Sequence, residues 1–237
     1  MPDPKGPARR ELTPYFPGKP SLNYHLFPLP SHLLFYVKNP KAGCSTVLVW
    51  LDRLHSGEHD FAPANVHTEH RLPRPRDLGW PVVSEMLGGA AYRFSFVRDP
   101  LRRFESAYRD KVVRQPKRRV EIQRTLGLTE DVESEVSFEQ FVTAVEQQDP
   151  VTEMNPHWRP QHVNLMHPVL HYDRIGRLES FDTDLALIRE EAGLPDVPYQ
   201  VRNISSRAGE ASAYDGRPDL VRRVQTVYAK DFELYGY

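Results

Sequence analysis

The pattern of apolar and polar positions predicts a strand, a turn and a helix near the start of the chain. Residues 33–38 form a short apolar run that ends at an Asn-Pro pair, as expected of a buried strand. Residues 44–55 then repeat apolar side chains at helical spacing, and Gly57 follows as a stop signal. This stretch therefore predicts a strand-turn-helix unit.

The rest of the chain continues the alternation of strands and helices. Further strands are expected at residues 91–98 and 168–179. Helices are expected at residues 100–114, 137–147, 181–193 and 217–237, with Asp99, Ser137 and either Asp182 or Thr183 as the caps of the first three. This order predicts the α/β fold class, with a central, mostly parallel sheet of about four or five strands flanked by helices.

Proline divides the chain into structured and loop-like parts. Sixteen of the 22 prolines lie in residues 1–30, 63–81 and 150–168. Residues 1–30 are therefore expected to form a proline-rich N-terminal arm, and residues 31–237 a single domain. Apolar residues make up 39% of the chain and charged residues 27%, which is typical of a folded protein rather than a disordered one.

Charge and cysteine content narrow the partners and the compartment. The net charge of −1 gives no overall indication of a nucleic-acid partner, although residues 98–124 carry ten basic side chains against four acidic ones. The single cysteine, Cys44, excludes an intramolecular disulfide and favours a reducing compartment. No secretory signal or membrane-length apolar segment is visible. We therefore expect a cytoplasmic protein without a stable membrane span; peripheral membrane association and oligomeric state stay open.

The turn "NPKAGCST", residues 39–46, has the composition of an anion-binding loop. Its glycine lets the backbone approach an anion closely, its hydroxyls and lysine add donors, and the following helix adds the positive end of its dipole. However, the lysine precedes the glycine, so the spacing differs from that of the ATP- and GTP-binding loop. An ordinary turn with a surface lysine would have the same composition.

A second stretch, "FSFVRDPLRRFESAYRDK" at residues 94–111, could hold another phosphate. Arg98 is expected at the end of a strand and Ser106 two turns into the next helix, so a guanidinium fork and a hydroxyl could converge there. For Arg102, Arg103 and Arg109 we expect a solvated, basic helix face instead.

The two stretches together resemble the paired signatures of the carbohydrate sulfotransferases, the family that includes the chondroitin and dermatan enzymes. The resemblance continues in "NPHWRPQ" (155–161), "YDRIGRLESFDTDLALI" (172–188) and "VYAKDFELYGY" (227–237). It implies a P-loop-like, three-layer domain. It also implies direct in-line transfer of a sulfuryl group from 3′-phosphoadenosine 5′-phosphosulfate (PAPS) to a hydroxyl of a carbohydrate or glycan-like acceptor.

The resemblance also assigns roles to residues of the two signatures. Lys41 would contact the 5′-phosphate and the bridging oxygen, and Ala42, Gly43, Cys44, Ser45 and Thr46 would hold the same phosphate. Arg98 and Ser106 would hold the 3′-phosphate. For the base that activates the acceptor we expect His67, with Glu69 and His70 as alternates; His70, His157 and Trp158 are expected near the acceptor.

Other features qualify this interpretation. His55 and His59 have a four-residue spacing, but no third ligand accompanies them, so no metal site is expected. The chain lacks the membrane anchor and several cysteines of the Golgi enzymes, which favours a soluble, bacterial-type member and leaves the acceptor open between a glycan, a glycolipid and a small hydroxylated metabolite. An ATP-dependent phosphotransferase and a non-catalytic nucleotide-binding relative remain the alternative functions.

Overall fold

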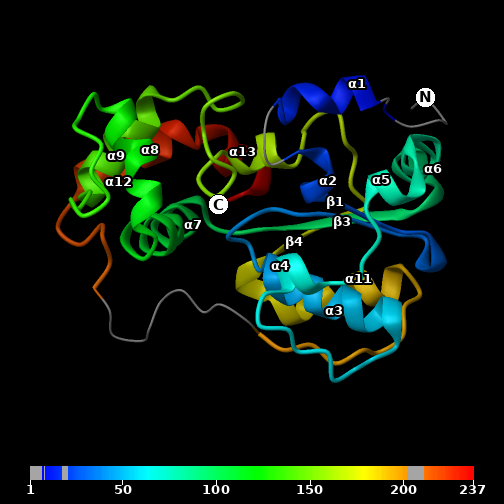
Figure 1. The fold of residues 1–237 in the computed structure, drawn as a ribbon. Helices are drawn as coiled ribbons and strands as arrows, with labels where there is room; N and C mark the ends of the chain where they lie inside the picture. Colours follow the sequence, from blue (N-terminus) through cyan, green and yellow to red (C-terminus); the bar gives the residue numbers. More distant parts are fainter. Residues whose placement is uncertain (1–6, 8, 18–20, 202–210) are drawn as a thin grey trace. The chain divides into compact units, whose positions relative to one another are not determined.

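The computed structural model describes residues 7, 9–17, 21–201 and 211–237. The described residues form two compact units (Figure 1). The first unit joins residues up to Val97 with residues 163–203, and the second unit joins residues 98–162 with residues 204–237. The single domain over residues 31–237 stays a prediction, and each unit is described by itself below.

A four-stranded sheet forms the centre of the first unit. Its strands lie in the order β1 (Leu26–Leu29), β2 (Leu34–Val37), β3 (Tyr92–Val97) and β4 (Arg174–Arg177). β1 pairs with β2 in antiparallel fashion, whereas the pairs β2–β3 and β3–β4 are parallel. The predicted α/β class with a mostly parallel sheet is therefore confirmed. β1 was not predicted, because its sequence falls within the proline-rich segment expected to be an arm.

Two helices, α3 (Cys44–Ser56) and α11 (Phe181–Glu191), cover one face of this sheet (Figure 1). The core between them is aromatic: Phe96 of β3 lies 4.7 Å from Phe181 of α11, measured between ring centroids. Trp50 of α3 packs edge-on against Phe94 at 6.1 Å. Burying side chains of this size stabilises a fold by about 1.5–3 kcal/mol each, so this layer holds α3 on the sheet.

Short helices fill the connections of the first unit. They are α1 (Arg9–Leu12), α2 (Leu22–His25), α4 (Val66–Glu69), α5 (Pro75–Leu78), α6 (Trp80–Glu85) and the single turns η1 (Thr13–Tyr15), η2 (Pro30–His32), η3 (Met86–Ala90) and η6 (Leu178–Ser180). α1 and α2 lie on the side of the sheet away from α3 and α11 (Figure 1). The proline-rich segment 63–81, expected to be loop-like, therefore contains the starts of three helices, α4, α5 and α6.

The second unit is helical. Its elements are α7 (Pro100–Ala107), η4 (Tyr108–Val113), η5 (Pro116–Arg118), α8 (Arg119–Thr125), α9 (Phe138–Gln147), α12 (Pro218–Val227) and α13 (Ala229–Tyr235), and α10 (Gln161–Asn164) marks its boundary with the first unit. α9 confirms its prediction, including the Ser137 cap whose hydroxyl accepts from the Gln140 N–H at 3.1 Å. The helix predicted at 217–237 is interrupted at Tyr228, which separates α12 from α13.

An arginine is part of the core of the second unit, against our expectation. Arg103 was predicted on a solvated face, but its side chain is only 1% exposed. Its guanidinium donates to the carbonyl oxygens of Arg159 at 2.8 Å and Pro156 at 3.0 Å. A buried cation needs such acceptors, and these carbonyls come from a turn about fifty residues away, which no local pattern reveals.

The start of α11 and the extent of β4 also differ from the predictions. α11 begins at Phe181 rather than after Asp182 or Thr183. The Asp184 carboxylate accepts from the Ser180 hydroxyl at 2.6 Å and from the Arg177 N–H at 2.8 Å, which orders the turn before the helix. β4 keeps only four residues of the strand predicted at 168–179, because the chain forms turns before it.

Gly176 of β4 allows the close approach of the aromatic layer. A Cβ at this position would lie 2.6 Å from Phe96 Cε1 and 2.9 Å from Asp184 Cβ. We therefore expect Gly176→Ala to lower the free energy of unfolding by about 1–3 kcal/mol, measured by denaturant titration. In the Phe96→Leu background the added methyl should cost less, because the ring that it meets is gone. An equal cost in both backgrounds would contradict this account.

Candidate functional site

The loop from β2 to α3 has an unusual backbone. Lys41 has φ 69° and Gly43 has φ 77°, so both lie in the left-handed region. For Gly43 the space is restricted as well, since a Cβ would lie 2.9 Å from Leu178 Cδ1. For Lys41 such a backbone is uncommon and costs on the order of 1–3 kcal/mol, a kind of strain that collects at functional sites.

The helix α3 begins directly after this loop, with Gly43 as its N-cap. Ser45 and Thr46, in the first turn of the helix, are 7% and 3% exposed. The N–H groups of a first helical turn and the positive end of the dipole attract anions, and α3 is long enough, with 13 residues, for this effect. Asn39 holds the loop in place, because its side-chain amide donates to the Phe96 carbonyl at 3.0 Å.

His67 lies beside this loop. α4 carries it, and the Asn65 side chain caps that helix by accepting from the His67 N–H at 3.1 Å. The imidazole Nε2 lies 3.1 Å from the Ser45 hydroxyl oxygen. The histidine expected from the sequence to act as a base is thus in hydrogen-bond contact with a residue of the expected phosphate loop.

His70 makes contacts within the fold. Its Nδ1 accepts from the Leu72 N–H at 3.1 Å, its Nε2 contacts the Arg74 guanidinium, and its ring packs against Phe27. Burial, and secondarily the charge of Arg74, lowers the pKa of His70 to about 4. The ring is therefore neutral at physiological pH and held by the protein, and its contact with an acceptor stays a prediction.

Lys41 of the first signature and Lys38, which directly precedes the signature, have different environments. Lys38 is 1% exposed, and its amine lies over the Tyr24 ring, 2.8 Å from the centroid. Burial lowers the pKa of Lys38 well below its usual value. Lys41 is only partly buried, on the loop itself. Lys41 is therefore the one of these two lysines that has the exposure a phosphate ligand requires.

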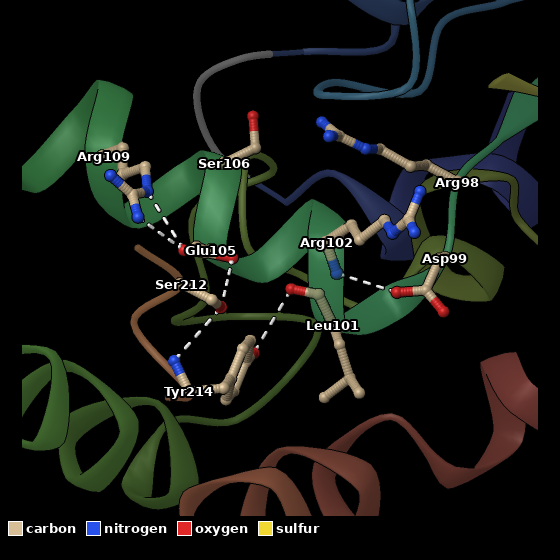
Figure 2. A pocket seen from close by; sticks show the side chains of 9 residues that line it. All are labelled: Arg98, Asp99, Leu101, Arg102, Glu105, Ser106, Arg109, Ser212 and Tyr214. Atoms are coloured by element: carbon tan, nitrogen blue, oxygen red, sulfur yellow. Dashed lines mark hydrogen bonds and ion pairs between the residues drawn. The ribbon is translucent and has the colours of Figure 1, made fainter. Parts of the chain in front are cut away.

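In the second unit, Arg98 and Ser106 line one pocket of about 480 Å³ (Figure 2). The other lining residues are Asp99, Leu101, Arg102, Glu105, Arg109, Ser212 and Tyr214. Figure 2 shows the Arg98 guanidinium extending along α7 toward the side to which the Ser106 hydroxyl points. The structure thus brings together the two residues that the second signature predicted, in a volume typical of small-ligand pockets.

Glu105, which sequence reasoning missed, organises one wall of this pocket. Its carboxylate pairs with Arg109 at 2.7 Å, and it accepts from the Ala213 N–H at 2.8 Å and from the Ser212 hydroxyl at 3.1 Å. The i,i+4 spacing of Glu105 and Arg109 could have predicted their ion pair. Nothing local could have predicted the contacts with Ser212 and Ala213, which lie more than a hundred residues away along the chain.

His157 and Trp158 do not line the pocket. His157 Nδ1 lies 2.7 Å from the Asn155 side-chain oxygen, within its own turn. Trp158 is 1% exposed, packs edge-on against Phe141 and donates to Gln148 Oε1 at 3.0 Å. Trp158 was expected near the acceptor, and this expectation is corrected: the indole is a core residue without an accessible face.

The described parts of the chain contain neither a metal-binding cluster nor a helix able to cross a membrane. Residues 7, 9–17, 21–201 and 211–237 contain no group of three or more His, Cys, Asp or Glu side chains that could hold a metal ion. Over the same residues, none of the helices combines the length and the apolar character that crossing a bilayer requires.

Comparisons with known proteins agree with the resemblance of the motifs. Residues 24–237 match the profile described as "Sulfotransferase family". The chain is also 34% identical over 110 residues to carbohydrate sulfotransferase 12 of Xenopus laevis; the match covers 43% of this chain and 26% of that relative. The matched part thus spans about a quarter of the relative's length. No solved structure matches the chain.

The profile match covers both signatures, the loop that precedes α3 and the pocket beside α7. It also includes the whole sheet, from β1 to β4. A match over almost the entire chain, rather than over one motif, establishes the relationship. The chain belongs to the sulfotransferase family.

Proposed function

We propose that the protein is a sulfotransferase that moves the sulfuryl group of PAPS to a hydroxyl of a carbohydrate. The observation that carries this proposal is the shared pocket of Arg98 and Ser106. A guanidinium fork and a hydroxyl are suited to a phosphate dianion, and a 3′-phosphate distinguishes PAPS from ATP. Family membership supports the sulfuryl chemistry. The carbohydrate acceptor comes from the name of the relative and is part of the proposal.

The loop before α3 is assigned to the 5′-phosphosulfate. The start of α3, with the Ser45 and Thr46 hydroxyls and the backbone of Ala42, Gly43 and Cys44, offers donors for that phosphate. The Lys41 ammonium neutralises the charge that develops on the bridging oxygen as the nucleotide leaves. Stabilising such charge with a fixed donor is worth about 2.7–4 kcal/mol.

His67 is assigned as the base. Transfer forms a bond from the acceptor oxygen to sulfur and breaks the bond from sulfur to the 5′-phosphate oxygen. The acceptor proton passes to His67 Nε2, and adenosine 3′,5′-bisphosphate leaves with the electron pair of the broken bond. The contact between His67 Nε2 and the Ser45 hydroxyl supports this role, because it holds the ring beside the phosphate loop.

The nucleotide site can be tested by thermal unfolding with adenosine 3′,5′-bisphosphate, with AMP and with ATP plus magnesium. At 100 times its dissociation constant a ligand adds about 2.7 kcal/mol to stability. At roughly 2–4 °C per kcal/mol, we expect the bisphosphate to raise the midpoint by roughly 5–11 °C. AMP should raise it much less, because it lacks the 3′-phosphate.

Arg98→Ala provides the matched control for this experiment. It should remove most of the shift with the bisphosphate and leave the response to AMP as it is. A shift with ATP and magnesium alone would support the phosphotransferase alternative. Tight binding of the bisphosphate without transfer to any member of a broad acceptor panel would support the non-catalytic alternative.

Lys41→Met should lower the transfer rate about 10²–10³-fold, because it removes the charge that stabilises the leaving group but keeps the length of the side chain. The measurement is transfer of sulfur-35 from PAPS to a panel of desulfated glycans. Lys117→Met, at an exposed position of the second unit, is the control and should leave the rate unchanged. Equal rates for Lys41→Met and the wild type would refute the assigned role.

His67→Gln should lower the same rate about 10²–10⁴-fold while binding of the bisphosphate persists. Glutamine can still contact the Ser45 hydroxyl, but it cannot accept a proton at neutral pH. His55→Gln, at an exposed histidine on α3, serves as the control. If His67→Gln keeps full activity, another group acts as the base, and Glu69 becomes the next variant to test.

A further inference from the structure

Arg98 lies where regular structure changes, so its backbone needs partners from elsewhere. β3 ends at Val97, and Asp99 caps α7 by accepting from the Arg102 N–H at 2.8 Å. Arg98 is thus the one residue between a strand and the cap of a helix. Buried backbone groups at such a junction must be paired by side chains or by ordered water.

The Gln161 side chain supplies both partners. Its Oε1 accepts from the Arg98 N–H at 3.0 Å, and its Nε2 donates to the Arg98 carbonyl at 2.8 Å. One planar amide therefore holds the two ends of a single residue. This fixes the backbone dihedral angles of Arg98, and with them the direction in which its side chain leaves the chain.

Gln161 is in turn held from α13. Its side chain is fully buried, and its own N–H donates to Asp231 Oδ2 at 2.6 Å. The second carboxylate oxygen of Asp231, which is also fully buried, accepts from the His162 N–H at 2.9 Å and lies 2.7 Å from His162 Nδ1. Asp231 thus locks the turn that carries Gln161, from a position seventy residues further along the chain.

The chemistry at position 161 is specific to an amide. Glutamine presents one acceptor and one donor at the spacing that the Arg98 N–H and carbonyl require. Glutamate would only accept, and methionine of similar length would do neither. The role therefore depends on the amide group and not on the volume of the side chain.

We propose that Gln161 is a positioning residue, held by Asp231, that aims the Arg98 guanidinium into the pocket and thereby sets the preference for a nucleotide with a 3′-phosphate. The proposal rests on the proposed function, because it takes Arg98 as the 3′-phosphate ligand. If Gln161 had a purely structural role, its loss would lower stability alone. The proposal predicts that its loss also weakens the recognition of the 3′-phosphate.

The test uses the full chain and compares the affinities for adenosine 3′,5′-bisphosphate and AMP by calorimetry in the wild type and in Gln161→Met. We expect the preference for the bisphosphate to fall roughly ten- to a hundredfold, the loss typical of a misplaced binding group, with the affinity for AMP unchanged. Gln140→Met is the matched control. It removes an amide that accepts from the Ser137 N–H at 2.8 Å and caps α9 in the same unit, so it should leave the preference intact.

A second variant covers the case in which Gln161→Met does not fold. Asp231→Asn keeps the Gln161 amide but weakens its support, and it should reduce the preference in the same direction by a smaller factor. An unchanged preference in the folded variants, or an equal loss of both affinities, overturns the positioning role of Gln161. If the wild type itself shows no preference for the bisphosphate, the proposed function fails instead.

Discussion

The turn from β2 into α3 depends on the absence of a side chain at Gly43. Its backbone is left-handed, and the space that a Cβ would take is occupied by Leu178. Leu178 follows β4, and Phe181, also within 3.8 Å of that position, starts α11 and packs on Phe96 of β3. The loop before α3 is therefore packed against residues that follow β4, at the opposite edge of the sheet from β1.

In the second unit, buried polar contacts fix the turns between residues 156 and 162. The carboxylate of Asp231 and the guanidinium of Arg103 are both removed from water and are satisfied by backbone groups of the turns between residues 156 and 162. Leaving such a group buried without a partner costs more free energy than a hydrogen bond contributes in net terms. These contacts therefore favour one arrangement of the turns. These turns carry Gln161, and the Gln161 side chain pairs with the Arg98 backbone. The buried contacts therefore also help to fix the position of Arg98.

The sequence predicted the parts of the molecule that depend on local patterns. The parallel strands β2 and β3, the helix α3 and the cap at Ser137 follow from periodicity and turn chemistry over a few residues. β1 was missed because its prolines suggested a loop. The contacts of Glu105 with Ala213 and of Gln161 with Arg98 were missed because these partners lie 108 and 63 residues away along the chain, and no local signal encodes such contacts. Resemblance to a family, rather than periodicity, supplied the site residues.

Residues of the same type that lie close together in the sequence differ in burial, and burial decides which of them a ligand could reach. Lys38 and Lys41 are three positions apart, yet desolvation favours the neutral form of the first, while the second is on the loop with part of its surface in water. Arg98 and Arg103 differ in the same way, since one lines a pocket and the other donates to carbonyls in the core. The number of basic residues in a segment therefore does not show which of them are accessible to a ligand. A charged group can bind an anionic ligand only where the fold leaves the group accessible to that ligand.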